Sequence, residues 1–313
     1  MKTTLIRGTH NLKPAHRGCV LTIGNYDGIH LGHQAVLTSV RERASELGVA
    51  SMVMTFEPTP MEYFAPEEAP ARLSSLRETV QDICAQHIAR LLCINFDQRF
   101  ADLSPQVFIE HLLVEKLYIR EILVGEDFRF GSQRAGDVQL LREQGERYGF
   151  SVAPMPTVEQ GGARVSSTRI RDALAIGDLA SVEALLGRPY RVSGRVIKGA
   201  QLGRTLNVPT ANIKLRRKPA PCYGVYAVEA ELEDGRRLPA AASLGIRPTV
   251  DNDSGKQCLL EVHILDFNED LYGQRLNVHF RHYLRPEARF DDTQALRTQM
   301  LADIEQARSL LAR

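Results

Sequence analysis

Short apolar segments alternate with helical segments through the first half of this 313-residue chain. Such an alternation is typical of a parallel sheet that carries helices on both faces. In sheets of this kind, ligands bind beyond the carboxyl ends of the strands. The sequence therefore predicts a doubly wound α/β domain over residues 1–186. We expect its strands at Val20–Ile23, Ala50–Phe56, Leu91–Phe96, Glu121–Val124 and Ser151–Val158, and its helices at Gln34–Leu47, Ser74–Gln86, Pro105–Glu115, Val138–Tyr148 and Arg171–Leu186.

The pattern changes after Gly187-Arg188-Pro189, where we place a domain boundary. The rest of the chain is rich in closely spaced strands, and the turns between them hold Gly, Asp and Asn. This pattern is typical of an antiparallel barrel or sandwich, which we expect over residues 187–313. The expected strands are Tyr190–Lys198, Gly224–Glu231, Arg237–Leu244, Cys258–Leu265 and Leu276–Tyr283, and Thr293–Leu311 has the apolar spacing of a terminal helix.

Residues 24–33 read Gly-Asn-Tyr-Asp-Gly-Ile-His-Leu-Gly-His and directly follow the first expected strand. The last of them, His33, opens an expected helix, and a helix N-terminus offers unpaired N–H groups and a positive dipole end to anions. Gly24, Gly28 and Gly32 suit unusual backbone angles or the close approach of a ligand. The segment is neither a Walker loop nor a dinucleotide fingerprint. It predicts a phosphate site, with a plain surface turn as the alternative.

Bulk composition excludes several classes of protein. A formal net charge of +1 and a pI near 7.7 give no reason to expect a nucleic-acid partner. No apolar run is long enough to cross a bilayer, and the first residues lack the apolar core of a signal peptide. The five cysteines form no Cys-x-x-Cys pair, which argues against a zinc site or a disulfide framework. We therefore expect a cytoplasmic protein with reduced thiols and no membrane partner.

Two further segments of the first half carry candidate binding residues. Ser166-Ser167-Thr168-Arg169-Ile170-Arg171 opens an expected helix. Capping explains one or two hydroxyls at a helix start, and the additional hydroxyl with two arginines suggests a phosphate clamp. Gly125–Gly131 follows a strand end and combines aromatic side chains, charges and glycines. This segment suits an acceptor ligand. The alternative is that one of its phenylalanines fills the core.

The His-x-Gly-His arrangement resembles the signature of the nucleotidylyltransferase superfamily, whose Rossmann-like domains transfer a nucleotidyl group and release pyrophosphate. Together with Gly125–Gly131, residues 134–137 (Arg-Ala-Gly-Asp) and Ser166–Arg171, the turn resembles the bacterial bifunctional riboflavin kinase/FAD synthetase family. The resemblance covers nearly the whole chain, with several motifs in the family's order. It implies an N-terminal FMN adenylyltransferase domain and a C-terminal riboflavin kinase domain.

The resemblance implies roles for residues of the first domain. His30 and His33 would stabilise the transition state at the α-phosphate of ATP, because preorganised donors act most strongly where charge develops. The remaining implied contacts to nucleotide, flavin or phosphate are made by Gly24, Asn25, Asp27, Gly28, Asp127, Ser167, Thr168 and Arg171.

The kinase motif of the family appears as Pro209-Thr210-Ala211-Asn212. In the family its Thr and Asn hold Mg²⁺ and nucleotide phosphates, so Thr210 and Asn212 are the implied metal ligands. Glu261 matches the catalytic base that lets the riboflavin hydroxyl attack ATP. By strand periodicity alone, Glu261 could equally face solvent. Gly199, Gly203, Arg204 and Arg285 match further binding positions.

Several positions depart from the family pattern. Thr59 replaces a frequent His, Tyr26 a usual Phe, Ala200 a usual Asp, and Asn207-Val208 a common Gly-Phe. We expect Ala200 and Asn207 to alter loop geometry and ATP affinity while the ligand and base residues stay in place.

We therefore expect an enzyme that phosphorylates riboflavin to FMN with ATP and then adenylylates FMN to FAD, with release of pyrophosphate. One alternative is an FMN adenylyltransferase whose second domain binds flavin without turnover. Another is a flavin-sensing or flavin-carrying protein. The sequence leaves the oligomeric state open.

Overall fold

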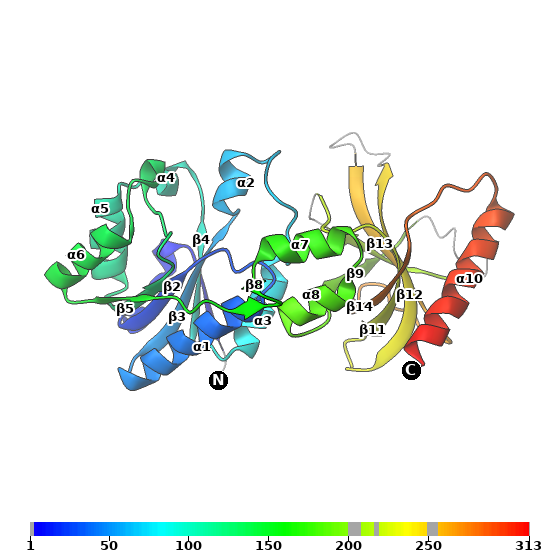
Figure 1. Ribbon diagram of the computed structural model, residues 1–313, viewed down its shortest axis with the longest axis horizontal. Coiled ribbons are helices and arrows are strands. Elements are labelled where there is room, and N and C mark those ends of the chain that lie inside the picture. Colours follow the sequence, from blue (N-terminus) through cyan, green and yellow to red (C-terminus); the bar gives the residue numbers. More distant parts are fainter. Residues whose placement is uncertain (1–2, 200–207, 216–218, 249–255, 313) are drawn as a thin grey trace. The chain divides into compact units, whose positions relative to one another are not determined.

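The computed structural model describes residues 3–199, 208–215, 219–248 and 256–312 (Figure 1). The chain forms two compact units. The first comprises residues 1–69 and 76–165, and the second comprises residues 70–75 and 166–313. The predicted boundary after residue 186 stays a prediction. Within the described ranges, no helix combines the length and apolarity that a bilayer crossing requires.

The first unit is built on a six-stranded parallel sheet with the order β1-β4-β3-β2-β5-β6. The chain first moves outward from β2 through β3 to β4, and then returns to place β5 on the other side of β2. The winding direction thus reverses at β2, and ligand sites in such sheets lie at this reversal. The strands are β1 (Thr4–Arg7), β2 (Cys19–Ile23), β3 (Ala50–Glu57), β4 (Arg90–Asn95), β5 (Ile119–Val124) and β6 (Ser151–Pro154).

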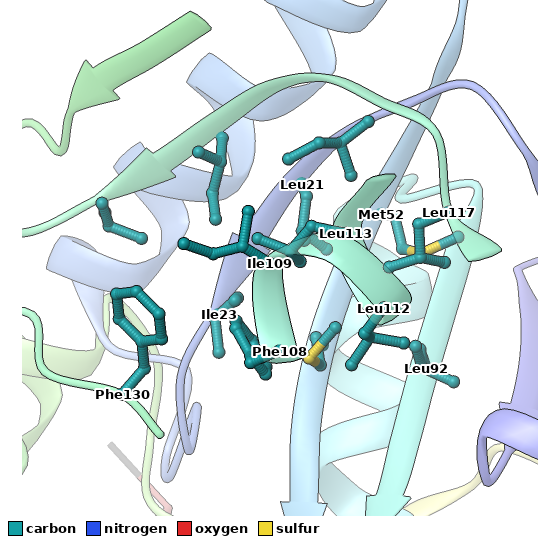
Figure 2. Close-up of a cluster of buried hydrophobic side chains, with 14 of the residues drawn as sticks. Leu21, Ile23, Met52, Leu92, Phe108, Ile109, Leu112, Leu113, Leu117 and Phe130 are labelled. Carbon is teal, nitrogen blue, oxygen red and sulfur yellow. The ribbon is translucent and has the colours of Figure 1, made fainter. Parts of the chain in front are cut away.

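Alternate side chains of each strand enter two separate apolar clusters, one on each face of the sheet. Leu21 and Ile23 of β2 join one cluster, whereas Val20 joins the other. On the first face lie η3 (Phe108–Lys116), which is π-helical, and α6 (Val138–Tyr148); Figure 2 shows the η3 side chains packed on the strands. On the second face lie α1 (Leu31–Glu46) and α3 (Leu76–Ala85). The predicted doubly wound arrangement is confirmed.

Short elements complete the first unit. They are the helical turns η1 (Thr9–Asn11), η2 (Pro14–His16), α2 (Pro60–Phe64), α4 (Gln98–Ala101), α5 (Pro105–Val107) and η4 (Ser132–Arg134), and the small hairpin of β7 (Glu159–Gln160) and β8 (Ala163–Arg164). Strand β1 was not predicted, and the expected strand over 151–158 ends at Pro154. Proline removes a donor from the ladder, which explains that early end.

The second unit contains a closed antiparallel barrel with the order β10-β13-β12-β11-β14-β9, in which β9 pairs back onto β10. Its interior is filled by alternate side chains such as Val228, Leu260, Val262 and Phe280, each at most 1% exposed. The prediction of an antiparallel barrel is confirmed, and the alternative of a sandwich is wrong. The strands are β9 (Arg191–Ile197), β10 (Ala211–Leu215), β11 (Gly224–Glu231), β12 (Arg237–Pro248), β13 (Lys256–Ile264) and β14 (Arg275–Arg285).

The C-terminal helix α10 (Thr293–Leu311) covers part of the outer barrel surface. Ile304 and Ala307 pack with Ala227 and Ala241 in one apolar cluster. At the edge of this contact, the buried carboxylate of Asp303 accepts two hydrogen bonds from the guanidinium of Arg285 at 2.9 and 2.7 Å. A bidentate pair of this kind fixes both distance and orientation, so it ties α10 to the end of β14.

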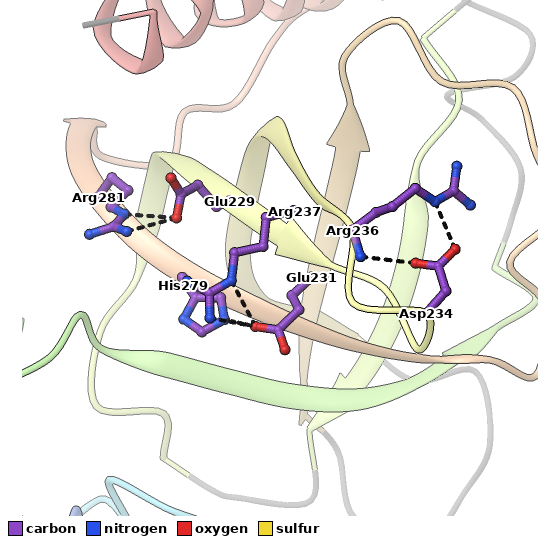
Figure 3. Close-up of polar contacts among 7 residues, drawn as sticks. All are labelled: Glu229, Glu231, Asp234, Arg236, Arg237, His279 and Arg281. Carbon is purple, nitrogen blue, oxygen red and sulfur yellow. Dashed lines mark hydrogen bonds and ion pairs between the residues drawn. The ribbon is translucent and has the colours of Figure 1, made fainter.

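Elsewhere the outer barrel surface carries a row of charged side chains (Figure 3). Arg281 of β14 donates to Glu229 of β11 at 2.8 Å, and His279 lies 2.8 Å from Glu231. Alternation along β11 and β14 sends these polar groups outward while their neighbours fill the interior. His279 is buried, and Glu229, Glu231 and Arg281 are half-buried.

Two helices precede the barrel in the second unit, where the sequence analysis expected one over 171–186. They are α7 (Ser167–Ala175) and α8 (Leu179–Leu186). The expectation of a single helix was wrong because Gly177 has a φ of 73° and Asp178 caps α8 through the N–H of Ser181. A left-handed glycine followed by an aspartate cap ends one helix and starts the next.

A buried carboxylate ties α1 to the sheet and generates a stability prediction. Glu121 of β5 is 3% exposed and accepts from Arg43 of α1 at 2.9 and 2.8 Å. These hydrogen bonds hold the pKa of the Glu121 carboxyl below its usual value. The ionised form is therefore favoured in the folded state. Its contribution is complete above the unfolded pKa, about 4.3, and is lost as the pH falls towards the lower folded pKa.

We expect Glu121→Gln to lower the free energy of unfolding by about 2 kcal/mol near neutral pH, because it leaves Arg43 without its buried partner. The deficit should stay constant down to about pH 4.3 and shrink below it, because the wild-type carboxylate also becomes protonated as the pH falls towards the lowered folded pKa. Urea denaturation across this range measures both quantities. Glu46→Gln is the matched control, because Glu46 also pairs with Arg43 but its side chain is 59% exposed. A deficit that does not change with pH would contradict the assignment.

Candidate functional site

Residues 24–33, the histidine turn, leave the sheet at the carboxyl end of β2, where the winding direction reverses. Tyr26 lies beneath the turn, 2% exposed, and its hydroxyl is 2.7 Å from Oγ1 of Thr22. A Cβ at Gly24 would lie 3.2 Å from the Tyr26 ring, so this position favours glycine. The buried ring therefore anchors a turn that the sequence alone shows only as glycine-rich.

His30 caps helix α1. Its Nδ1 accepts a hydrogen bond from the backbone N–H of His33 at 3.2 Å, as an N-cap side chain does. An accepting Nδ1 carries no proton, so the neutral ring bears its proton on Nε2. The rings of His30 and His33 stack at 3.7 Å between centroids, with an interplanar angle of 12°. The cap thus fixes the tautomer of one histidine and holds it against the other.

His33 is kept neutral by its surroundings. Burial, with additional contributions from His30 and Arg164, holds the pKa of the His33 imidazole well below its usual value of 6.5. Its Nδ1 is buried and makes no hydrogen bond within the part of the chain that the structure describes. Two neutral imidazoles at a helix N-terminus can donate N–H groups to an anion without themselves changing charge.

The other predicted residues of the turn lie beside the histidines. The Asn25 carbonyl accepts from the Thr55 hydroxyl at 3.3 Å, which links the turn to β3. Gly28 has a φ of 88°, and Asp27, which precedes it in the chain, is half-buried. Tyr26 and Ile29 also have positive φ values, of 50° and 40°. Such angles in bulky residues are uncommon, and they cluster at sites where the backbone is shaped for a ligand.

Asp127 lies at the same edge of the sheet, because β5 neighbours β2 and its following loop carries this residue. Asp127 is exposed. Phe130 fills the core and stacks with the half-buried Phe128 at 5.6 Å. The core-filling alternative therefore holds for Phe130, while the aspartate stays open to solvent.

The first turn of α7 shows how its hydroxyls are divided. Ser166 is the N-cap, and its Oγ accepts from the N–H of Arg169 at 3.3 Å. Ser167 and Thr168 lie inside the helix, so capping does not account for them. Arg171 donates from Nε to the Ala71 carbonyl at 2.6 Å, which orients its guanidinium. The cap was not predicted specifically at Ser166, although an N-cap residue immediately precedes its helix.

The barrel brings the predicted base and a predicted metal ligand together. Asn212 of β10 stands directly opposite Glu261 of β13 in the antiparallel register. Residues paired in this way lie on the same face, with Cβ atoms about 5 Å apart. Both lie on the outer face, since Val262 and Ile213 fill the interior. Asn212 is 7% exposed and Glu261 is half-buried. The role of Glu261 as the base stays a prediction.

The surroundings of Asn212 suit a hard cation. A Cβ at Gly199 would lie 2.7 Å from the Asn212 side chain, so only glycine fits that approach. The Asn212 Nδ2 donates to the Thr210 carbonyl at 3.3 Å, which leaves its Oδ1 as an acceptor. The hydroxyl and amide oxygens of Thr210 and Asn212 are ligand types that Mg²⁺ accepts. No cluster of three or more His, Cys, Asp or Glu among the described residues could hold a metal.

A cavity of 580 Å³ adjoins this group, and Thr210 lines it. The ammonium of Lys198 lies 5.8 Å from the centroid of the ring of Tyr272, which lines this cavity. Neither Phe267 nor Tyr272 was predicted as a site residue. The lining combines aliphatic and aromatic side chains, such as Val196, Val262, Ile264, Phe267, Leu271 and Tyr272, with the polar side chains of Thr210, Asn268, Glu269 and Asp270.

The remaining predicted positions of the second half are Gly203, Arg204 and Arg285. Gly203 and Arg204 lie outside the described residues, as do Ala200 and Asn207. Arg285 is engaged with Asp303 and with the Pro286 carbonyl at 2.9 Å. Its predicted binding role stays a prediction.

All five cysteines are free thiols.

Comparison with known families matches both parts of the chain. A family described as FAD synthetase matches residues 12–169, and a family described as riboflavin kinase matches residues 186–311.

Relatives match over nearly the full length. A protein of Pseudomonas fluorescens named bifunctional riboflavin kinase/FMN adenylyltransferase is 49% identical over 98% of both chains. One of the same name from Escherichia coli K12 is 47% identical over 96% of this chain and 95% of that one. A solved structure described as a macrolide-efflux protein from Streptococcus pneumoniae has a TM-score of 0.79 and 30% identity, covering 98% and 99% of the two chains. The chain therefore belongs to the family of bifunctional riboflavin kinase/FMN adenylyltransferases.

Proposed function

We propose that this chain converts riboflavin to FMN and FMN to FAD at two separate sites. The observation that carries the proposal is that each unit gathers one set of reactive side chains. The first unit holds the stacked pair of His30 and His33, and the second holds Asn212 opposite Glu261. The names of the full-length relatives support this two-activity function over a transferase with an inactive second domain and over a carrier.

In the kinase reaction, Glu261 takes the proton of the riboflavin 5′-hydroxyl as its oxygen attacks the γ-phosphorus of ATP. The bond to the β-phosphate oxygen breaks, and FMN and ADP result. Thr210 and Asn212 would hold Mg²⁺, which neutralises charge on the phosphates when bound. The cavity that Thr210 lines offers the adenine ring the side chains of Phe267 and Tyr272, and polar groups lie beside them.

In the adenylyl transfer, an FMN phosphate oxygen attacks the α-phosphorus of a second ATP, and pyrophosphate leaves. Charge builds on the α-phosphate oxygens in the transition state. The Nε2–H of His30 and the N–H of neutral His33 would donate to these oxygens. Because both rings are already stacked and oriented, little reorganisation accompanies the reaction.

The remaining predicted contacts belong to the same proposal. Asn25, Asp27 and Asp127 would contact nucleotide or flavin at the carboxyl edge of the sheet, where Gly24 and Gly28 shape the turn. Ser167, Thr168 and Arg171 would bind phosphates, and Gly203, Arg204 and Arg285 would contact kinase substrates. A boundary after residue 186 and a cytoplasmic location complete the proposal, and the free thiols support the location.

Replacing the base should separate the two activities. We expect Glu261→Ala to slow FMN formation from riboflavin by about 10²- to 10⁴-fold, while supplied FMN is still adenylylated. Chromatographic separation of flavins after incubation with ATP and Mg²⁺ measures both products. Glu229→Ala is the control, because Glu229 also lies on the outer barrel face but pairs with Arg281. FMN formation at the wild-type rate by Glu261→Ala would exclude this residue as the base.

Replacing the histidines should have the converse effect. In the double variant His30→Asn with His33→Ala, asparagine keeps the N-cap of α1 but loses the Nε2 donor. We expect FAD formation from FMN to fall by at least about 10²- to 10³-fold, with FMN formation from riboflavin unchanged. His111→Ala serves as the control, since this histidine is exposed and pairs with the exposed Glu115. Undiminished FAD production by the double variant would rule out the assignment.

A further inference from the structure

The segment that carries Thr210 lies just outside the barrel ladder. Strand β10 begins at Ala211, which pairs with Val262 of β13. The next pair in this register would set Thr210 against His263, but the ladder has already ended. Pro209 has no N–H with which to continue it. Thr210 therefore needs another means of being held in place.

Two side chains supply that means. His263 lies with Nδ1 2.8 Å from the Pro209 carbonyl oxygen, and a carbonyl can only accept, so Nδ1 carries the proton. On the other side of Thr210, Asn212 Nδ2 donates to the carbonyl of Thr210 itself. The peptide oxygens before and after the Thr210 Cα are thus both hydrogen-bonded to side chains of the barrel.

A third contact fixes the approach to this segment. Val208 is 1% exposed and packs in the apolar cluster with Ile304 and Ala307 of α10. His263 projects from the same outer face of β13 as Glu261, two residues along the strand. One strand therefore carries both the predicted base and the side chain that holds the Thr210 segment.

We propose that His263 is a positioning residue of the riboflavin kinase site. Its Nδ1–H fixes the Pro209 carbonyl and thereby places the Thr210 hydroxyl for the nucleotide phosphates and their cation. This inference rests on the proposed kinase function of the barrel. His263 touches no reacting atom, and its effect passes through the backbone of Pro209 and Thr210.

Two variants of the full chain separate the hydrogen bond from the rest of the ring. His263→Leu removes the donor at similar size, whereas His263→Asn places an amide nitrogen where Nδ1 lies. We expect the leucine variant to lower kcat for FMN formation about tenfold and to weaken binding of Mg·ADP, measured calorimetrically without turnover, by a similar factor. The asparagine variant should stay within about threefold of wild type in both measurements, since it keeps the donor.

FAD formation from supplied FMN by the same samples is the internal control for folding, and it should not change. Nitrogen NMR of the wild-type imidazole should show the proton of His263 on Nδ1. Equal activity and Mg·ADP affinity in wild type and the leucine variant would overturn the inference, and so would equal impairment of both variants. Failure of the wild-type protein to make FMN would instead contradict the proposed function.

Discussion

The complete burial of β2 is the constraint on which the first unit depends. Each side chain of Cys19–Ile23 is at most 4% exposed, since apolar clusters cover both faces and β3 and β5 flank both edges. A strand enclosed in this way can expose new chemistry only where it ends. The chain must leave the sheet there through a turn that satisfies its own polar groups, and Tyr26, Gly24 and the cap at His30 provide that turn.

The two candidate sites preorganise their side chains by different physical means. In the first unit, one hydrogen bond to His30 both starts a helix and selects the ring nitrogen that carries the proton. In the barrel, strand pairing sets Asn212 against Glu261, and side-chain contacts extend this order to Thr210, which has left the ladder. Helix capping and strand register therefore perform the same task, which is to fix donors and acceptors before a substrate binds.

The sequence predicted most elements and both architectures because hydrophobic periodicity is a local signal. It predicted the strand before the histidine turn and the helix after it for that reason. The break at Gly177-Asp178 was also encoded locally, but the apolar spacing continued across it and concealed it. That Asn212 and Glu261 lie opposite each other could not be predicted from the local pattern, because it depends on the register between two strands far apart in the chain. The same holds for His263, whose partner is a backbone oxygen 54 residues away.

The pairing of Asn212 with Glu261 has a consequence for how this chain can vary. Side chains alternate faces along a strand, so a shift of β10 against β13 by a single residue would send one of the two into the barrel interior. Strands β11 and β12 lie between β10 and β13 in the chain, so no single loop sets this register. An insertion or deletion within either paired strand is therefore tolerable only if the facing of Asn212 and Glu261 is kept. For anyone who redesigns this part of the barrel, the register of this single pair is the quantity to preserve.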